Sequence, residues 1–399
     1  MAKEKILIVG GGFGGVKAAL ELADDDRFAV TLVSSHANLR YYPTLFHTAT
    51  GGSRANSSIP FDDLFADKNL TVYIDKAVSL DRKANTVTTE SNLTLEYDTL
   101  ILGMGVVTNY FGIEGLQEYS FGIKTGQETA ELKAHLHRQM LDDAAPDLNY
   151  IIVGAGPTGI ELAGALPAYL RHIMKEHGMS HRKIKVAVVE ASPSLLPYLP
   201  KDVSRMVRRR LRKLGVTLLL KHKVEGQTAD SLTVNGKKVP TETVIWTAGV
   251  TNNPFFSDNN FVIARRGKVA VDTYLQTENN IFVIGDNANT PYSGMAQTAL
   301  YDGRFVAINL QRRASGKDMK SYKAMRPITV IPSGPHWAAL IWGKVHLHGW
   351  LGWVLREVAD YVAFNDYESW PKATRQFFTE LNEQDACQVC DTKALYENA

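Results

Sequence analysis

The chain has few cysteines and no long apolar run. Of its 399 residues only Cys387 and Cys390 are cysteines, and both lie near the C-terminal end. Two late cysteines give no disulfide scaffold, which indicates a reducing compartment, and one C-x-x-C has too few ligands for a zinc site. No uninterrupted apolar stretch reaches the roughly 18 to 20 residues that a membrane-spanning helix needs. We therefore expect no disulfide-rich secreted domain, no metal centre and no transmembrane helix.

The chain also lacks a strong charge of either sign. It carries 44 Lys and Arg residues against 42 Asp and Glu residues, a formal net charge of +2. Because the two signs are mixed, we expect no nucleic acid as the main partner. The first five residues lead directly into an apolar run, which leaves no room for a secretory signal and indicates a cytoplasmic protein. The length allows two or three domains with cores of their own.

What the chain does have is two glycine-rich loops of one design, in residues 6–15 and 150–159. In each, an apolar strand leads into G-x-G-x-x-G and then into a helix. The first glycine permits a tight turn, the second lets backbone N–H groups approach a pyrophosphate, and the third permits close packing of helix on strand. One such loop is weak evidence, because glycine turns also join ordinary strands to helices. Two loops in the proper context predict two dinucleotides.

A second strand follows each loop and should end near an adenosine ribose. The strand at 28–33 ends at Ser34 and Ser35, where an acidic residue is usual, so only weaker hydrogen bonds are available. The strand at 184–189 ends at Glu190. Its distance from the second loop exceeds the usual ~20 residues, which we attribute to a longer helix and loop. A carboxylate at this position accepts hydrogen bonds from ribose hydroxyls and repels a 2′-phosphate, so NADH is preferred over NADPH.

Two later segments complete the pattern. Residues 97–105 form a buried strand that ends in small residues, as is needed where backbone lies close to a cofactor. Residues 280–286 form a strand ending in Gly285 and Asp286, and a helix follows at 296–311. A single Gly-Asp is more often a turn. After two dinucleotide loops, the order strand, Gly-Asp, helix is much more specific.

These motifs resemble the flavoprotein reductases with two dinucleotide-binding domains, and residues 153–164, 244–250 and 296–299 resemble type II NADH:quinone oxidoreductases. The resemblance covers residues 3 to 310 well and the tail loosely. It implies an α/β fold with two Rossmann-like dinucleotide-binding domains, like glutathione reductase, and a C-terminal membrane-associating region. The expected domains are 1–112 with 250–325 for FAD, 113–249 for NADH, and 326–399 for an amphipathic membrane anchor with a flexible tail.

The same resemblance assigns the site residues. Asp286 would bind the ribityl chain of FAD, and Pro43 and Thr44 would lie under the flavin. The expected FAD-binding set is Gly10, Gly12, Phe13, Gly14, Gly15, Ser34, Pro43, Thr44, Ala77, Gly103, Gly105, Gly285, Asp286, Ala296 and Gln297. The expected NADH-binding set is Gly154, Gly156, Thr158, Gly159, Glu190, Ala248 and Gly249. His36 and His47 flank the segment at 41–44 and stay unassigned.

Three residues are expected to be catalytic. The resemblance places Glu161 near the nicotinamide and the quinone entrance, although an acid in the first turns of a helix is also favoured by the helix dipole alone. It places Gln297 and Tyr301 on the quinone-facing side of the flavin. Tyr301 departs from the family pattern A-Q-x-A-x-Q-x-G, in which this position is a second glutamine. A phenol still donates to a quinone carbonyl, but its ring is bulkier.

Five of the six tryptophans fall in one late stretch: Trp337, Trp342, Trp350, Trp353 and Trp370. Tryptophan favours membrane interfaces, and in this stretch Leu347, Leu351, Val354, Val358 and Tyr361 recur at helical spacing, with Lys344 and Arg356 available to snorkel toward headgroups. Membrane attachment is the favoured interpretation. A helix packed on the FAD domain or in a homodimer interface is the alternative.

An arginine-rich run at 201–214 has a helical apolar face of Val203, Met206, Val207, Leu211 and Leu214. Its charges could form a phosphate or membrane patch, but a solvated helix face is the favoured interpretation.

The sequence thus predicts a peripheral enzyme on the cytoplasmic face of the cell membrane that passes two electrons from NADH through FAD to a quinone without pumping protons. Disulfide reductases of this fold need a redox cysteine pair beside the flavin, and sulfide:quinone reductases need cysteines in the central and late core. Here the only pair is Cys387 and Cys390, so neither chemistry is expected unless the tail folds back. The alternatives are a soluble NAD(P)H-dependent flavoprotein reductase that feeds a carrier protein or oxygen, and a flavin-binding regulatory protein whose redox state controls partner binding.

Overall fold

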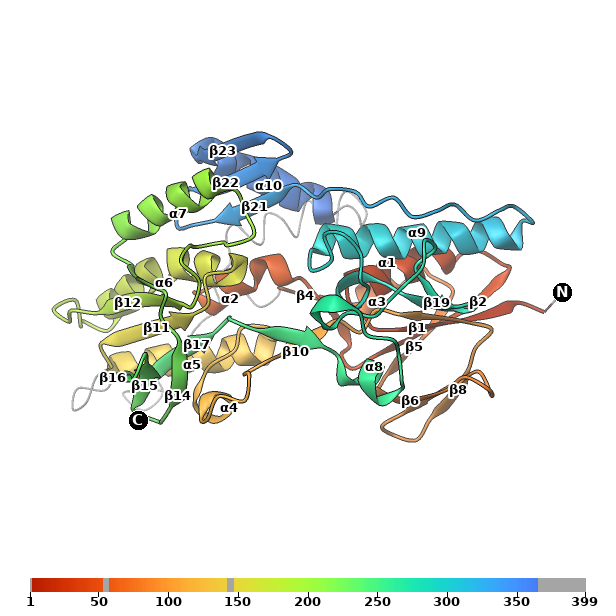
Figure 1. The fold of residues 1–399 in the computed structure, drawn as a ribbon, viewed down its shortest axis with the longest axis horizontal. Helices are drawn as coiled ribbons and strands as arrows, with labels where there is room; N and C mark the ends of the chain where they lie inside the picture. Colours follow the sequence, from red (N-terminus) through yellow and green to blue (C-terminus); the bar gives the residue numbers. More distant parts are fainter. Residues whose placement is uncertain (1, 53–56, 142–146, 365–399) are drawn as a thin grey trace, which may run out of the picture.

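The computed structural model describes residues 2–52, 57–141 and 147–364. Two sheets lie side by side, each with helices on one face and smaller strands on the other (Figure 1). The antiparallel ladder of β10 (Val106–Thr108) with β18 (Val250–Asn252) runs between them. Trp370, Cys387, Cys390 and the predicted flexible tail lie outside the described residues.

The first sheet has six strands in the order β19-β20-β9-β1-β2-β5. The central strand β1 is parallel to both β2 and β9. Its side chains alternate: Ile6 and Ile8 join the core under the helices, whereas Leu7 and Val9 join the core on the opposite face. Both faces are covered, which explains the unbroken apolar run. The strands are β1 (Glu4–Val9), β2 (Phe28–Ser34), β5 (Leu70–Ile74), β9 (Thr99–Leu102), β19 (Gln276–Glu278) and β20 (Ile281–Val283).

Helices α1 (Phe13–Leu22) and α9 (Ala296–Ala314) cover one face of this sheet. Their backbones approach closely at the start of α1, because a Cβ on Gly14 would lie 2.9 Å from the Ala299 carbonyl oxygen, and one on Gly303 would lie well inside 3.0 Å of the Gly14 oxygen. The last glycine of the A-Q-x-A-x-Q-x-G segment is therefore a packing residue.

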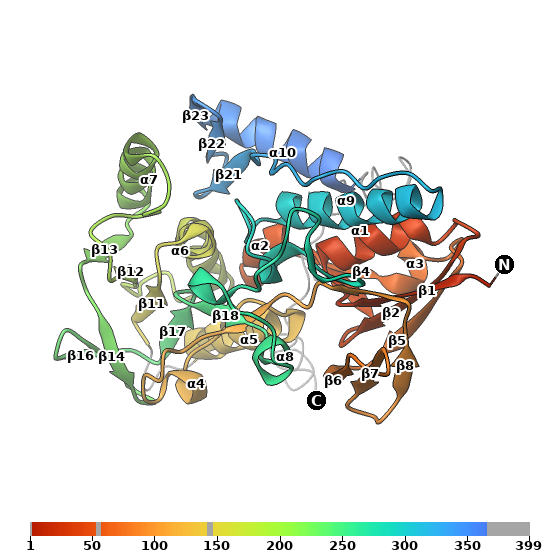
Figure 2. The same cartoon turned by 45° about the vertical axis from the view of Figure 1, so that its right-hand side comes forward.

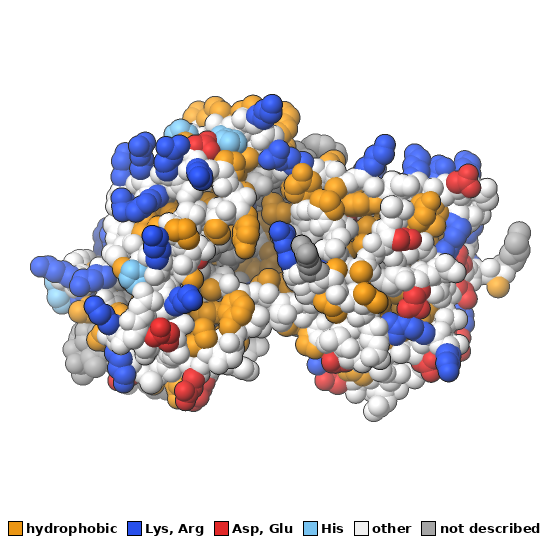
Figure 3. Space-filling model, viewed as in Figure 1, with side chains coloured by type: hydrophobic (Ala, Val, Ile, Leu, Met, Phe, Trp, Pro, Cys, Tyr) orange, Lys and Arg blue, Asp and Glu red, His pale blue; other side chains and the backbone are white. Residues whose placement is uncertain are grey.

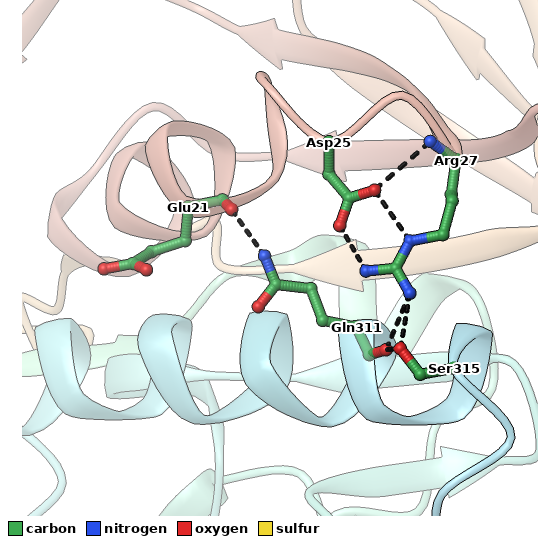
Figure 4. A network of polar contacts seen from close by, with 5 residues as sticks. All are labelled: Glu21, Asp25, Arg27, Gln311 and Ser315. Atoms are coloured by element: carbon green, nitrogen blue, oxygen red, sulfur yellow. Dashed lines mark hydrogen bonds and ion pairs between the residues drawn. The ribbon is translucent and has the colours of Figure 1, made fainter.

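Polar contacts fix the far end of this helix pair (Figure 4). Gln311 Nε2 donates to the Glu21 carbonyl oxygen at 2.9 Å. Arg27 donates to the Gln311 carbonyl oxygen at 3.2 Å and to Ser315 Oγ at 2.6 Å, and Asp25 holds its guanidinium from the other side. The start of β2 is thereby bonded to the end of α9.

The other face of the first sheet is covered by shorter elements, seen below it in Figure 2. These are β6 (Ala77–Asp81), β7 (Thr86–Thr89), β8 (Thr94–Glu96) and α8 (Pro254–Asp258). Connecting segments carry β3 (Asn38–Arg40), η1 (Tyr42–Thr44), α2 (Leu45–Ala49), β4 (Ser58–Pro60), α3 (Phe61–Leu64), η3 (Arg265–Gly267) and η4 (Gly285–Asn287).

The second sheet repeats the plan with four parallel strands in the order β13-β12-β11-β17. Tyr150 and Ile152 of its central strand face the helices, and Ile151 and Val153 face the small sheet β14-β15-β16. The strands are β11 (Asn149–Val153), β12 (Lys185–Glu190), β13 (Thr217–Leu220), β17 (Thr243–Trp246), β14 (Val224–Gln227), β15 (Ser231–Val234) and β16 (Lys237–Pro240). The helices are α4 (Leu116–Tyr119), α5 (Gly126–Leu141), α6 (Pro157–Glu176) and α7 (Lys201–Lys213).

A third sheet and a helix follow α9 and lie against the second unit. They are β21 (Thr329–Pro332), β22 (Ala338–Trp342), β23 (Val345–Gly349) and α10 (Trp350–Phe364). The turn after β21 packs tightly on α6, since a Cβ on Gly164 would lie well inside 3.0 Å of the Gly334 nitrogen. Leu347 lies on β23, so its predicted place on the helix is wrong. The amphipathic α7 is confirmed, with Val203, Val207 and Leu211 fully buried.

No helix among the described residues is both long enough and apolar enough to cross a membrane. Within the same residues, no group of three or more His, Cys, Asp or Glu side chains could hold a metal ion.

Candidate dinucleotide and electron-transfer site

The two glycine loops occupy equivalent places at the carboxyl ends of β1 and β11. Gly10 N donates to the Val33 carbonyl oxygen and Gly154 N donates to the Val189 carbonyl oxygen, both at 2.8 Å. Gly10 and Gly154 have φ angles of +117° and +107°. An L side chain rarely adopts this backbone conformation, so the turn itself requires glycine at the first position of each motif.

The third glycine of each motif is required by packing. A Cβ on Gly15 would lie well inside 3.0 Å of the Gly10 carbonyl oxygen, and one on Gly159 would meet the Gly154 oxygen equally closely. Either side chain would push the helix away from its strand.

The second glycine of each motif faces open space. A Cβ on Gly12 or on Gly156 would have no protein atom within 4 Å. Each of these glycines is also the N-cap of the following helix, α1 or α6, and no side chain caps either helix. The first N–H groups of both helices are therefore available to a ligand, and a pyrophosphate fits this arrangement in charge and in hydrogen bonding.

The strand ends differ between the two units. The β1–β2 and β11–β12 registers make Ser34 equivalent to Glu190, each one residue beyond a paired valine. Glu190 accepts hydrogen bonds from Ala155 N and Ser192 N, both at 2.7 Å, which hold the carboxylate beside the second loop. Ser34 Oγ instead donates to the His36 carbonyl oxygen at 2.8 Å and lies under Gly11. Both stay predicted ribose ligands.

Asp286 lies on η4, directly after β20. The next residue, Asn287, is fully buried, and its amide exchanges two hydrogen bonds with Gly105, accepting from N at 2.8 Å and donating to O at 2.7 Å. This pair fixes η4 against the end of β9 and so brings Gly103, Gly105 and Asp286 together. Sequence reasoning missed Asn287, whose only signal is its place after Gly-Asp.

Asp302 is a second functional residue that sequence reasoning missed. It is fully buried within α9, where Oδ2 accepts from Gly285 N at 3.0 Å and Oδ1 accepts from the Tyr322 hydroxyl at 2.7 Å. Burial raises the pKa of Asp302 to about 6. Asp302 is therefore bonded to the turn that carries Asp286 and, being fully buried, is not open to solvent.

Two lysines balance the charge of Asp286. Burial raises the pKa of Asp286, and Lys268 and Lys124 oppose this. Lys268 Nζ donates to Ser293 Oγ at 2.5 Å. Lys124 Nζ is buried and has no hydrogen-bond partner among the described residues, and burial lowers its pKa to about 8. Glu128 and Asp286 offset part of its charge, but a buried ammonium without a hydrogen-bond partner is costly, so a ligand with acceptor atoms fits beside it. Together with the open Gly12 loop, this fits FAD.

The predicted flavin-proximal segment lies on η1, over the start of α1. The rings of Tyr41 and Tyr42 have centroids 5.8 and 6.3 Å from that of Phe13. Thr44 is buried and its hydroxyl donates to the Tyr41 carbonyl oxygen at 3.1 Å. The Pro43 carbonyl oxygen accepts from Arg356 of α10 at 3.3 Å.

That contact corrects one expectation. Arg356 is only 8% exposed and points into the protein, so it does not snorkel toward headgroups. The buried guanidinium instead ties the C-terminal helix to the segment over α1.

The three predicted catalytic residues lie on two helices. Glu161 is partly buried near the start of α6. Gln297 and Tyr301 lie one turn apart at the start of α9, which no side chain caps. Gln297 Oε1 accepts from Ile328 N at 3.1 Å, and the Tyr301 ring centroid lies 5.7 Å from that of Tyr322. Their contacts with cofactor and quinone stay predictions.

The remaining predicted ligands lie around the two loops or in the core. Gly103 and Ala248 pack directly against the first glycines, Gly10 and Gly154 respectively. Thr158 is exposed near the start of α6, and Ala77 is buried in the core below β1. The others in this group are Gly249, beside Phe111, and Ala296, the first residue of α9.

Several known proteins are similar to this chain in sequence and in fold. The chain is 28% identical over 361 residues to the type II NADH:quinone oxidoreductase of Staphylococcus epidermidis, covering 83% of this chain and 88% of that one. It is 25% identical over 367 residues to the Staphylococcus aureus enzyme of the same name, covering 86% and 90%. Its fold matches NDH2 from Plasmodium falciparum in complex with NADH, with a TM-score of 0.86, 18% identity and coverage of 95% and 97%.

The fold also matches the sulfide:quinone oxidoreductase of Aquifex aeolicus, with a TM-score of 0.77, 19% identity and coverage of 97% and 98%. At these identities the two structures establish the fold alone. The profile of the pyridine nucleotide-disulphide oxidoreductases matches residues 4–303, well over half of the chain, and the chain belongs to that family.

Proposed function

We propose that this protein is a type II NADH:quinone oxidoreductase. It converts NADH, a proton and a quinone to NAD⁺ and a quinol, with FAD as the resident cofactor and without proton pumping. The observation that carries the proposal is the duplicated loop geometry, in which Gly12 and Gly156 both face open space at uncapped helix starts. The names of the staphylococcal relatives support the same reaction.

FAD, when bound, supplies the chemistry that accepts a hydride from NADH and passes on two electrons. The first unit binds and orients it. The N–H groups at the start of α1 receive the pyrophosphate, and Asp286 receives the ribityl hydroxyls. Asn287 and Asp302 hold the turn that carries Asp286, so these two are positioning residues.

The second unit binds NADH. The start of α6 receives its pyrophosphate, and Glu190 faces the adenosine ribose. Two backbone N–H groups already orient the Glu190 carboxylate, whose remaining lone pairs are available to ribose hydroxyls. Its negative charge disfavours a 2′-phosphate. Glu161 lies one helical turn beyond Thr158, on the side assigned to the nicotinamide.

Gln297 and Tyr301 form the quinone side of the flavin. They lie four residues apart, so both side chains are on one face of α9. The tyrosine hydroxyl and the glutamine amide each offer a donor to a quinone carbonyl. The chain's only cysteines are residues 387 and 390, so the described residues around the two glycine loops offer no cysteine for the disulfide and sulfide chemistry of other members of this fold.

The quinone is a membrane component, and we propose peripheral attachment to the cytoplasmic face through an aromatic ridge. The ridge comprises Trp342, Val345, Trp350, Leu351 and Val358 of β22, β23 and α10. Trp342 is 65% and Trp350 66% exposed, although large apolar side chains are normally buried. Trp337 and Trp353 pack instead against the protein, near Arg210 and His336. A homodimer through the same ridge is the competing arrangement.

Steady-state turnover tests the reaction. Purified holoprotein with NADH and a water-soluble quinone should consume the two in equal amounts over many cycles. A regulatory flavoprotein would be reduced once and then stop. A reductase specific for a carrier protein would turn over only with that carrier.

Flotation with liposomes tests the attachment. The variant Trp342→Ser/Trp350→Ser should lose vesicle binding while it keeps turnover with a water-soluble quinone. A shift from dimer to monomer in solution, without a change in vesicle binding, would favour the homodimer.

A further inference from the structure

We propose that the outer side of α7 is a binding site for anionic phospholipid headgroups and forms the second half of the membrane-docking surface. Its residues are Arg205, Arg208, Arg209, Arg212 and Lys213, named here the cationic face. The inference rests on the proposed membrane attachment and adds to it a lipid class and a second structural element.

The composition of α7 is one-sided. Between Lys201 and Lys213 it carries seven basic side chains and one acidic one. The acidic residue, Asp202, is engaged by His346. The members of the cationic face are exposed, and none of them forms an ion pair among the described residues.

If solvent alone covers this face, its like charges modestly destabilise the helix. Arg205 with Arg209, and Arg209 with Lys213, are like charges four residues apart, which repel on a helix. No other helix among the described residues carries such a run. Helix α6, for comparison, pairs His172 with Glu176. An anionic surface would relieve the repulsion on α7, and this favours the membrane interpretation over a solvated face.

The position of α7 joins the cationic face to the aromatic ridge. Asp202 Oδ2 lies 2.7 Å from His346 Nδ1 of β23. Arg210 turns away from the cationic face and donates to the carbonyl oxygens of Ser333 and Pro335, at 3.0 and 2.9 Å, in the turn before β22. These contacts fix α7 beside the third sheet.

The space-filling view shows the result (Figure 3). Lys and Arg side chains gather over α7 at the upper left, next to the apolar side chains over β23 and α10 at the top. A flat bilayer that receives the exposed apolar side chains of β22, β23 and α10 would therefore have its headgroups close to α7.

The chemistry fits a phosphate-bearing surface. Tryptophan favours the interface between headgroups and acyl chains, and a guanidinium binds phosphate oxygens in a bidentate manner. A basic side chain at an anionic membrane surface strengthens binding about five-fold. The effect fades as salt shortens the screening length to about 3 Å at 1 M.

The test compares two charge variants of the FAD-loaded full chain. Arg205→Gln/Arg209→Gln removes two charges from the cationic face. Lys237→Gln/Lys238→Gln removes two from β16, which lies on the opposite side of the second unit from α7 (Figure 1). All three proteins are measured by sedimentation with vesicles of phosphatidylcholine alone and of phosphatidylcholine mixed with phosphatidylglycerol. Turnover with a water-soluble quinone, expected to be unchanged in both variants, checks folding.

We expect the wild type to bind the mixed vesicles more tightly than the neutral ones. The arginine variant should lose about 25-fold in partitioning to mixed vesicles and little to neutral ones, and the lysine variant should match the wild type. Added salt should reduce the difference in binding to mixed vesicles between the arginine variant and the wild type. If the arginine variant and the lysine variant bind mixed vesicles equally well, the inference is wrong. The cationic face is then either only solvated or a binding site for another acidic partner.

The aromatic-ridge variant separates this inference from the proposal beneath it. Suppose that Trp342→Ser/Trp350→Ser loses binding to both vesicle types, and the wild type binds both equally well. Membrane attachment through the ridge is then supported, and selectivity for anionic lipid is wrong. If that variant binds both vesicle types like the wild type, attachment through the ridge is wrong, and the inference falls with it.

Discussion

Two alanine substitutions in the second glycine loop should separate its role in nucleotide binding from its role in helix packing. Gly156 has φ −72° and ψ 178°, a backbone conformation open to any residue, and its added Cβ would touch no protein atom within 4 Å. Gly156→Ala should therefore fold normally, because the lower entropy of the unfolded chain, about 0.4–1 kcal/mol, offsets the weaker preference of alanine for the N-cap position.

The same methyl group would occupy the space proposed for the NADH pyrophosphate. Loss of one charge-assisted hydrogen bond costs roughly 1.5–3 kcal/mol, so Kd for the nucleotide should rise about 10- to 150-fold. FAD content should not change, because the first loop is untouched.

Gly159→Ala is the matched control. Its Cβ would lie well inside 3.0 Å of the Gly154 oxygen and 2.7 Å from Thr247 Oγ1, and overpacking of this kind costs about 1–3 kcal/mol. Thermal unfolding of the holoprotein and calorimetric titration with NAD⁺ measure both quantities. The reasoning is refuted if Gly156→Ala binds NAD⁺ like the wild type, or if it is destabilised as much as Gly159→Ala.

Three further substitutions test other parts of the site. Glu190→Arg should raise the ratio of kcat/KM for NADPH to that for NADH by roughly 10-fold or more, because it removes ribose acceptors and offers a cation to the 2′-phosphate; an unchanged ratio would contradict the assignment. Burial raises the pKa of Asp302 to about 6 in the folded protein, above the ordinary carboxyl value of 3.8. The protonated Asp302 therefore stabilises the folded protein fully below pH 3.8, and this stabilisation is lost as pH rises through 6. The free energy of unfolding of the wild type should therefore fall relative to Asp302→Asn between pH 4.5 and 7.5, whereas a constant difference in urea titrations would count against a protonated carboxyl. Tyr301→Phe should slow the oxidation of the reduced enzyme by quinone by an amount equivalent to roughly 0.5–1.5 kcal/mol and leave reduction by NADH unchanged; stopped-flow rates equal to wild type with several quinones would remove Tyr301 from the quinone site.

Much of the fold follows from local pattern. The glycine loops and their strands were predictable because each motif places a tight turn, an open backbone and a close helix contact at fixed spacing. The apolar face of α7 was equally predictable, since Val203, Val207 and Leu211 repeat with the period of a helix.

Features that depend on tertiary contacts were not predictable. Asn287 and Asp302 take their importance from partners outside their own elements: Gly105, distant in the sequence, and Tyr322, in the segment after α9. Leu347 is spaced like a helical residue from Leu351, but it lies on β23 because Leu340 of β22 pairs with it. The direction of Arg356 is set by the Pro43 carbonyl, which no pattern in α10 indicates.

The most direct test of the proposed function is a two-step anaerobic stopped-flow experiment on the FAD-loaded protein. One equivalent of NADH should bleach the oxidised flavin absorbance, and a water-soluble quinone added next should restore it with one equivalent of quinol formed. If the reduced protein persists in the presence of excess quinone but is reoxidised by another acceptor, the protein is a reductase of this family and not a quinone reductase.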